Sequence, residues 1–316
     1  MKLLVTRKLT DAVEARVARE FDATFRNGAA PMSEEEAHQA LADYDALLVT
    51  LGDKLSATAF ADMPRAKIVA NFGVGYNHID VAAAQAKGLT VTNTPGAVTD
   101  ATADIAVMLI LMSARRASAG ERFVRRGDWT GWTPTQFLGH HVSGKRVGIV
   151  GMGRIGTAIA KRCHYGFGME VLFTKRTPLP DPGLPARQVE QDELLKSCDF
   201  VVVAVPASPA THHLIGAEEI AKMQSHAHLI NIARGDIVDE AALIAALQEN
   251  RIAGAGLDVY EREPYVPEAL REMENVTLLP HLGTAALEVR DAMGHMAVDN
   301  LVAFRDGKEP PNRVSA

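Results

Sequence analysis

The sequence has few of the residues that mark secreted, membrane-spanning or nucleic-acid-binding proteins. Its two cysteines, Cys163 and Cys198, have no CxxC spacing and make no disulfide framework, which fits a reducing compartment. The most apolar segment, residues 105–112, is too short to span a bilayer, and the N-terminus lacks the long apolar stretch of a signal peptide. A net charge of −6 gives no reason to expect a nucleic-acid or anionic-membrane partner. We therefore expect a cytoplasmic protein without such partners.

Metal ligands are also scarce in the sequence. Histidines gather at positions 140–141, 212–213 and 226/228, but none of these sets has carboxylate or thiolate partners at the usual ligand spacing. We interpret them as loop or solvent-facing histidines and predict no metal site.

The length and composition predict two folded domains. A chain of 316 residues with 47% hydrophobic and 23% charged residues is long enough for two domains with substantial cores. In the first part, short apolar runs at 3–6, 46–49, 67–70 and 89–92 alternate with helical patterns at 11–20, 33–41 and 81–87. This alternation favours a small parallel α/β domain. A long apolar helix is expected from Thr99 or Asp100 to about residue 119, and an irregular loop over 125–144.

A second alternation begins at Lys145. Six strands are expected at 146–150, 170–174, 200–205, 228–233, 254–259 and 276–279, with helices at 192–196, 218–223 and 240–248. Six is the number expected of a doubly wound dinucleotide-binding sheet. The helical stretch 288–304 should pack back against the first domain. We predict an α/β protein in which a doubly wound dinucleotide-binding domain, residues 99–285, is inserted into a smaller flavodoxin-like domain, residues 1–98 and 286–316.

The most informative motif lies directly after the first strand of the second domain. Gly151, Gly153 and Gly156 form a GxGxxG pattern between an apolar strand and a helical pattern. The first glycine permits a tight turn, the second lets the backbone approach phosphate oxygens, and the third lets the helix pack close to the strand. The helix N-terminus, with Arg154 and Ile155, offers free N–H groups to a pyrophosphate. The motif predicts dinucleotide binding.

The residues after the second strand indicate which dinucleotide is preferred. NAD-selective proteins carry an acidic residue about twenty positions after the glycines, where it binds the ribose hydroxyls. Here Lys175, Arg176 and Thr177 stand in that region. Two cations suit the 2′-phosphate of NADPH, because arginine can bind a phosphate through two hydrogen bonds. The alternative is a basic pair that only solvates a loop.

Polar side chains follow the last three predicted strands of the second domain. Arg234 comes just past the fourth strand. Asp258 and Glu263 lie at the end of the fifth, and His281 follows the sixth. Reduction of a 2-oxo acid requires a cation for the substrate, a proton donor near neutral pH, and an acid partner that keeps the donor protonated. On the residues alone, the alternatives stay equally open: Arg234 could form a surface ion pair, Glu263 could be a turn residue, and His281 could be a loop histidine.

Six separate stretches of the sequence form a set of motifs: residues 71–80 (NFGVGYNHID), 92–96 (TNTPG), 151–156 (GMGRIG), 231–235 (NIARG), 256–259 (GLDV) and 280–284 (PHLGT). Together they resemble the D-isomer-specific 2-hydroxyacid dehydrogenases, and most closely their glyoxylate/hydroxypyruvate reductase branch. The resemblance covers nearly the whole length, and motifs in the family's order are far more specific together than any one alone.

The resemblance implies a role for each matching residue. Arg234 would bind the carboxylate and carbonyl of the substrate, His281 would be the general acid, and Glu263 would hold the other ring nitrogen of the histidine. Val74 and Gly75, in the substrate domain, would offer backbone N–H groups to the substrate carboxylate. Asp258 would lie on the nicotinamide side of the cofactor and Thr102 near its phosphate or ribose. The remaining cofactor path would be lined by Val205, Pro206, Ile232, Ala233, Gly283 and Thr284.

Two further features bear on the substrate and the assembly. The loop 128–139 holds both tryptophans, Trp129 and Trp132. A local hydrophobic anchor is one interpretation; the resemblance implies instead a homodimer in which Trp132 helps to shape the neighbouring subunit's substrate pocket. The short side chains and glycine around Leu51 suit a small substrate.

The sequence therefore predicts NADPH-preferring reduction of a small 2-oxo acid, glyoxylate or hydroxypyruvate, to the D-2-hydroxy acid, with NADH as a second cofactor. Two alternatives stay open. One is a related dehydrogenase that reduces a bulkier 2-oxo acid with NADH. The other is a dinucleotide-sensing, corepressor-like binding protein that keeps the same residues but turns over little substrate. Turnover with small 2-oxo acids separates these hypotheses.

Overall fold

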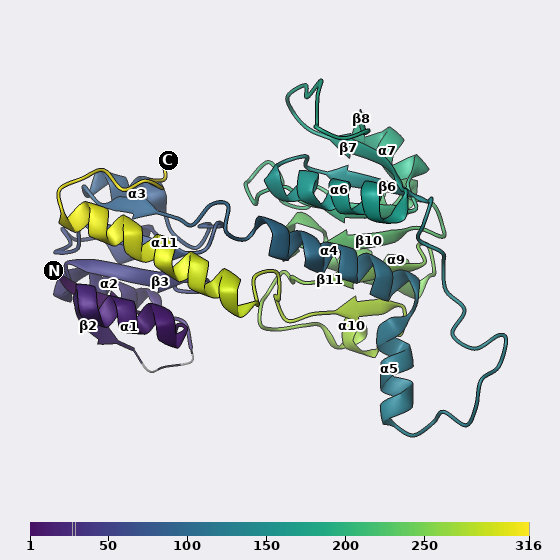
Figure 1. Cartoon of the computed structure of the whole chain (residues 1–316), viewed down its shortest axis with the longest axis horizontal. Coiled ribbons are helices and arrows are strands. Elements are labelled where there is room, and N and C mark those ends of the chain that lie inside the picture. Colours follow the sequence, from purple (N-terminus) through teal and green to yellow (C-terminus); the bar gives the residue numbers. More distant parts are fainter. Residues whose placement is uncertain (27, 29, 316) are drawn as a thin grey trace. The chain divides into compact units, whose positions relative to one another are not determined.

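Each of the two strand–helix alternations folds into a parallel sheet of its own (Figure 1). The computed structural model describes residues 1–26, 28 and 30–315. The chain divides into one unit of Met1–Val98 with Ala285–Ala316 and another of Thr99–Thr284, so the second unit interrupts the first along the sequence. The predicted α/β class with two parallel-sheet domains is confirmed.

The first unit has a five-stranded sheet in the order β2-β1-β3-β4-β5, which is the order of flavodoxin-like sheets. The strands are β1 Lys2–Val5, β2 Asp22–Phe25, β3 Ala46–Thr50, β4 Ile68–Phe72 and β5 Thr90–Thr92. Four of them were predicted from apolar runs. The edge strand β2 was not, because its side chains alternate between exposed and half-buried and therefore form no such run.

Five helices belong to the first unit, among the residues that the structure describes. They are α1 Asp11–Glu20, α2 Glu34–Asp43, the 3₁₀ turn η1 Ala57–Phe60, α3 Val81–Ala86 and the closing helix α11 Leu287–Arg305. Helix α11 packs on α1 so closely that a Cβ at Gly294 would overlap the side chain of Val13. Ion pairs from Arg16 to Asp299 and from Arg305 to Glu20 join the same two helices. The C-terminal helix thus completes the core of the N-terminal sheet (Figure 1).

The second unit has seven strands where six were predicted. They are β6 Arg146–Val150, β7 Glu170–Thr174, β8 Arg187–Gln188, β9 Phe200–Val203, β10 His228–Asn231, β11 Gly254–Leu257 and β12 Val276–Leu278. Their order, β12-β11-β10-β9-β6-β7-β8, is the doubly wound arrangement of dinucleotide-binding sheets with one strand added. The missed strand β8 has only two residues, both polar, at the sheet edge. The strands predicted at 200–205, 228–233 and 254–259 each end two residues earlier in the structure, because the apolar pattern continues into loop residues that are buried or half-buried.

Helices cover both faces of this sheet. Residues of α4 Thr99–Ala114 and α6 Arg154–Phe167 share one core with alternate strand residues such as Phe200 and Val202. The intervening residues Val201 and Val203 face the other core, with α7 Gln191–Ser197, α8 Ala217–Lys222 and α9 Glu240–Gln248. The shorter elements are α5 Ala117–Arg125, η2 Gly235–Ile237 and α10 Glu268–Glu272. Because both faces are covered, the strands read as continuous apolar runs in the sequence.

The long helix expected to reach residue 119 is wrong beyond Ala114. The carbonyl oxygen of Ala114 accepts a hydrogen bond from His140 N at 2.8 Å, and Arg116 adopts a left-handed backbone with φ of 52°. A contact from a residue distant in the sequence thus takes the place of the next intrahelical bond. The chain then restarts as α5, which projects from its unit in Figure 1 together with residues 126–145.

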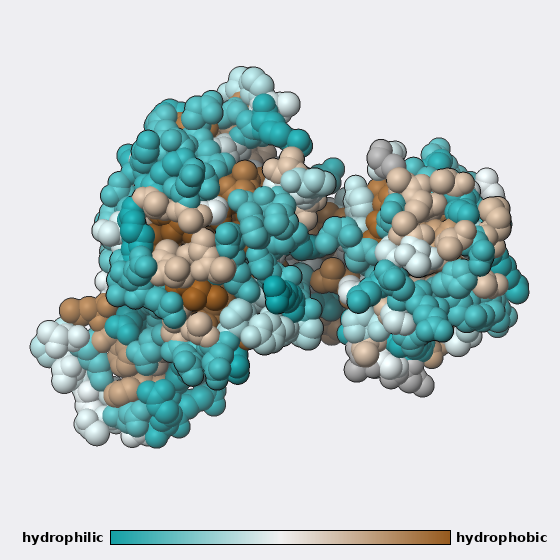
Figure 2. Space-filling model, turned by 180° about the vertical axis from the view of Figure 1, so that it is seen from behind, coloured by the Kyte–Doolittle hydropathy of each residue, from teal (hydrophilic) through white to brown (hydrophobic). Residues whose placement is uncertain are grey.

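The surface is mostly hydrophilic in the view of Figure 2, with scattered apolar side chains. The projecting segment carries four large ones, Val124, Trp129, Trp132 and Leu138, which are 56%, 55%, 80% and 67% exposed. Across the described part of the chain, no helix combines the length and apolarity needed to cross a membrane.

The interpretation of His228 as a loop or solvent-facing histidine is wrong, because it is buried on β10 and is linked to His140. His228, only 3% exposed, contacts Ser113 Oγ through Nδ1 at 2.7 Å and His140 Nδ1 through Nε2 at 3.0 Å. Burial, with a smaller contribution from the charges of His140 and His226, lowers the pKa of His228 to about 4. The folded protein therefore keeps this ring neutral where the unfolded chain would bind a proton.

We expect this buried ring to make the protein sensitive to acid. Because the folded pKa lies below the ordinary value of 6.5, the stabilisation is fully present above pH 6.5 and is lost as the pH falls towards 4. The loss amounts to about 3 kcal/mol. In urea denaturation, the loss of stability from pH 7 to pH 4 should be about 3 kcal/mol larger in the wild type than in His228→Gln, which cannot take up the proton. The exposed His141→Gln is the control, and an equal drop in all three proteins would contradict the prediction.

Candidate active site

The glycine motif has the geometry of a phosphate-binding turn. Gly151 follows β6 with φ of 104°, and a Cβ there would crowd the backbone of Ala204. A Cβ at Gly156 would overlap the carbonyl oxygen of Gly151, so only glycine lets α6 approach the strand this closely. At Gly153, the N-cap of α6, a Cβ would meet no described atom within 4 Å. Arg154 and Ile155 form the first turn of the helix, whose N–H groups suit an anion. These residues fit the pyrophosphate of a dinucleotide.

The segment after β7 is basic and exposed. Lys175, Arg176 and Thr177 all have exposed side chains, and within the described residues neither cation forms an ion pair with a carboxylate. No acidic side chain stands where a ribose-binding carboxylate would be expected. The carboxyl edge of the sheet also holds the other predicted cofactor residues: Val205 and Pro206 after β9, Ile232 and Ala233 after β10, and Gly283 and Thr284 after β12.

A histidine–glutamate pair joins the loops that follow β11 and β12. His281 Nδ1 lies 2.8 Å from Glu263 Oε2, and the two side chains are 29% and 31% exposed. Burial opposes ionisation of Glu263, but the hydrogen bond from His281, the Tyr260 N–H and the charge of Arg234 outweigh it. The pKa of Glu263 is therefore held below its ordinary value. The carboxylate occupies Nδ1 and leaves Nε2 of the imidazole for another partner.

Asp258 holds the backbone at and after His281 in place. The carboxylate of Asp258 accepts hydrogen bonds from Leu282 N at 2.6 Å and Gly283 N at 2.9 Å. The backbone carbonyl oxygen of Asp258 accepts a third, from His281 N at 3.0 Å. Burial raises the pKa of Asp258, opposed by the Leu282 N–H and the charge of His281. The hydroxyl of Thr102, a residue of α4, donates a hydrogen bond to Gly283 O at 3.1 Å. These contacts fix His281 in a left-handed conformation with φ of 55°.

Arg234 is positioned by the turn after β10. Asn231 Nδ2 donates to Arg234 O at 2.8 Å, and Asn231 Oδ1 accepts from Ala233 N at 3.0 Å. Gly235 then approaches the backbone of Tyr260 so closely that any Cβ would overlap it. This contact brings Arg234 near the Glu263 turn, and their charges interact: burial lowers the pKa of the half-buried guanidinium, while Glu263 opposes that shift. The site thus gathers one cation, one carboxylate and one imidazole.

The substrate residues predicted in the first unit lie at the ends of its strands. Hydrogen bonds to its carbonyl oxygens hold the Gly73–Gly75 loop after β4. Asn71 Nδ2 donates to Gly73 O and to Gly75 O, each at 3.0 Å, and Asn93 Nδ2 donates to Val74 O at 2.9 Å. In the part of the chain that the structure describes, the N–H groups of Val74 and Gly75 have no hydrogen-bond partner. They are therefore available to an anion. Leu51 follows β3 and is half-buried.

Sequence reasoning missed a second histidine–carboxylate pair that supports the first. His213 Nε2 lies 2.6 Å from Glu261 Oε1, two residues before Glu263. It ties the segment after β9 to the turn that carries Glu263. No local signal identifies this pair, because its members are 48 residues apart. Gly235 and Asn231, in contrast, lie within the NIARG motif quoted above.

Other reactive groups do not form sites among the described residues. No cluster of three or more His, Cys, Asp or Glu side chains there could hold a metal ion. Both cysteines are buried, and burial raises the pKa of each thiol to about 12, so neither is a nucleophile at neutral pH.

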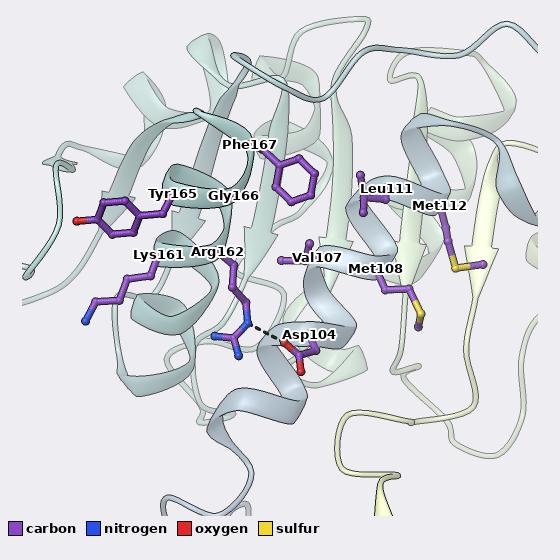
Figure 3. A pocket seen from close by; sticks show the side chains of 10 residues that line it. All are labelled: Asp104, Val107, Met108, Leu111, Met112, Lys161, Arg162, Tyr165, Gly166 and Phe167. Atoms are coloured by element: carbon purple, nitrogen blue, oxygen red, sulfur yellow. Dashed lines mark hydrogen bonds and ion pairs between the residues drawn. The ribbon is translucent and has the colours of Figure 1, made fainter.

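An apolar groove of about 800 Å³ lies between α4 and the second half of α6 (Figure 3). Met108, Leu111 and Phe167 line it, and Arg162 bridges its two helices through an ion pair with Asp104. The groove contains none of the residues of the histidine–glutamate pair or the glycine motif, so it is distinct from the candidate active site.

Comparison with known proteins identifies a family that matches most of the second unit. Residues 107–283 match the family described as D-isomer specific 2-hydroxyacid dehydrogenase, NAD binding domain. Over 320 residues the chain is 43% identical to the glyoxylate reductase of Thermococcus onnurineus, covering 99% of this chain and 96% of that protein. It is 47% identical over 279 residues to the glyoxylate reductase of Thermococcus gammatolerans, covering 86% of this chain and 83% of that protein.

A solved structure extends the similarity to both units. The NADPH-dependent glyoxylate/hydroxypyruvate reductase from Sinorhizobium meliloti, in complex with NADP and malonate, superposes with a TM-score of 0.89 at 37% identity. The match covers 99% of this chain and 96% of that one. The similarity therefore includes the first unit, which the family match at residues 107–283 does not reach.

Proposed function

This chain belongs to the D-isomer specific 2-hydroxyacid dehydrogenases, a family of NAD(P)-dependent oxidoreductases, and we propose that it reduces a small 2-oxo acid with a preference for NADPH. The proposed substrates are glyoxylate, hydroxypyruvate or both, and the product is the D-2-hydroxy acid. The observation that carries the proposal is the His281–Glu263 pair at 2.8 Å, with Arg234 close enough for its charge to interact with Glu263.

The proposed chemistry assigns each side chain one task. A nicotinamide dinucleotide bound at Gly151–Gly156 supplies the hydride that C2 of the substrate receives. Arg234 binds the substrate carboxylate and polarises the C2 carbonyl, since guanidinium binds carboxylates through two parallel hydrogen bonds. His281 holds a proton at Nε2 and gives it to the developing alkoxide oxygen. Glu263, ionised and bonded to Nδ1, stabilises the protonated ring and fixes its orientation.

The preference for NADPH rests on charge. Lys175 and Arg176 follow β7, at the position where NAD-selective proteins carry a carboxylate that would repel the 2′-phosphate. Both side chains are exposed, and within the described residues neither has a carboxylate partner. A 2′-phosphate would gain charge-assisted hydrogen bonds from this pair. Leu51, Val74 and Gly75, all half-buried, keep the substrate-binding role that the resemblance implies for them.

We also propose a homodimer. The exposed Trp129 and Trp132 on the projecting segment, together with the apolar groove beside α4, provide apolar surface that a second copy would cover. Trp132 keeps its proposed role at the neighbouring subunit's substrate pocket. Sedimentation velocity should give the mass of two chains, whereas a single-chain mass at micromolar concentration would reject the dimer.

The function is tested by NADPH and NADH oxidation with glyoxylate, hydroxypyruvate, pyruvate and phenylpyruvate, each cofactor assayed separately. Rapid NADPH-dependent turnover of the first two acids is the expected result. A preference for NADH would reject the cofactor assignment and keep the reaction. Tight dinucleotide binding without turnover of any acid would reject the reaction and favour the dinucleotide-sensing alternative.

A further inference from the structure

One side chain outside the glycine motif makes several hydrogen bonds to the backbone of the basic segment after β7. Gln188, on the edge strand β8, makes three hydrogen bonds to residues 175–179. Its Oε1 accepts from Leu179 N at 2.8 Å, and its Nε2 donates to Lys175 O at 2.8 Å and to Thr177 O at 3.4 Å. A single amide therefore ties together both ends and the middle of the segment that carries Lys175 and Arg176.

The chemistry of these contacts requires a glutamine. The backbone N–H of Leu179 can only donate and the two carbonyl oxygens can only accept, so the amide has one orientation that satisfies all three. A glutamate would keep the bond from Leu179 but would set a negative charge against two carbonyl oxygens. A leucine of similar size would lose every bond.

Strand β8 itself is fixed to the sheet. Gln188 pairs with Phe173 of β7 in parallel register, and Val189 N donates to Phe173 O at 2.9 Å. Arg187 forms an ion pair with Glu193 at 2.7 Å on the following helix. Gln188 thus links the sheet to a segment whose side chains at 175–178 are exposed, while Leu179 is half-buried against the core.

We propose that Gln188 is a positioning residue for cofactor selection: by fixing the backbone of residues 175–179, it holds Lys175 and Arg176 where they bind the 2′-phosphate of the dinucleotide. This inference rests on the proposed NADPH preference. Long cationic side chains lose much rotamer freedom when they bind, so a fixed backbone is needed for two of them to meet one phosphate. The contacts of the Gln188 amide are all with the backbone of this segment.

The test compares two ligands that differ only in the 2′-phosphate, adenosine 2′,5′-bisphosphate and 5′-AMP, by titration calorimetry. Loss of all three hydrogen bonds in Gln188→Leu should weaken bisphosphate binding about tenfold. Binding of 5′-AMP should stay within about twofold, as should kcat, while the KM for NADPH rises with the bisphosphate Kd. Gln191→Leu, three residues along the chain, is the matched control and should change neither affinity, because its amide bonds Leu214 O and not the basic segment.

A double substitution separates positioning from general damage. In a Lys175→Ala, Arg176→Ala background, Gln188→Leu should cause no further loss of bisphosphate affinity, because the groups that it positions are gone. Gln188→Glu should weaken the bisphosphate in the same direction, and it carries the test if the leucine variant fails to fold.

Three results overturn the inference, and they are distinguishable. Equal weakening of both ligands would show that Gln188 supports the whole site. Unchanged bisphosphate affinity in both Gln188 variants would show that the segment holds its shape without the amide. Equal affinity of the wild-type protein for the two ligands would reject the NADPH preference itself and the role of Gln188 with it.

Discussion

Replacing His281 with alanine should lower kcat by about 10²- to 10⁴-fold, the range for loss of a positioned general acid. Without the imidazole, the alkoxide that forms at C2 has only water to supply its proton. His281 is assigned to the substrate oxygen and not to the cofactor path, so dinucleotide binding should stay within about twofold. Steady-state kinetics and dinucleotide titration on the same preparation check both halves of the prediction.

The left-handed backbone at position 281 calls for a second variant. Alanine is strained at φ of 55°, whereas asparagine tolerates this conformation. His281→Asn should therefore lose as much activity as His281→Ala while keeping the wild-type melting temperature. His141→Ala, at an exposed histidine, is the control and should keep full activity. Activity within tenfold of wild type in His281→Asn would reject the general-acid assignment.

Replacing Arg234 with alanine should lower kcat/KM for the 2-oxo acid by about 10³-fold, through two charge-assisted hydrogen bonds. Both parameters should change, because the guanidinium binds the substrate carboxylate in the ground state and polarises the carbonyl in the transition state. The KM should rise and kcat should fall. Rate measurements over a wide range of glyoxylate concentrations separate the two effects.

The lysine variant distinguishes charge from geometry at this position. Arg234→Lys keeps the cation but loses the planar fork, so it should recover only part of the lost kcat/KM. The dinucleotide affinity of both variants should match the wild type. Full recovery by lysine would show that a point charge suffices, and a loss confined to dinucleotide binding would place Arg234 outside the substrate site.

The predictability of each strand depended on how far its side chains are buried, since the edge strands β5 and β12 are mostly buried and were predicted. Central strands such as β6 and β9 are buried on both faces, so they appear in the sequence as apolar runs. The edge strands β2 and β8 have one neighbour and exposed side chains, and no apolar run marks them. The end of α4 was also missed, because the hydrogen bond from His140 to Ala114 joins residues 26 positions apart, and helical periodicity carries no information about it.

The candidate site shows the same division. The sequence by itself determined which residue types stand at the strand ends, because Arg234, Glu263 and His281 lie within motifs or just beyond them, and the glycine spacing reports a backbone requirement that is local. Only the tertiary structure decided that Glu263 takes Nδ1 of His281, that Gly235 brings the Arg234 turn against Tyr260, and that Gln188 shapes the basic segment. Each of these contacts joins residues from different strand ends. A local pattern records the conformation of its own residues, whereas such contacts exist only after the sheet has brought its strands side by side.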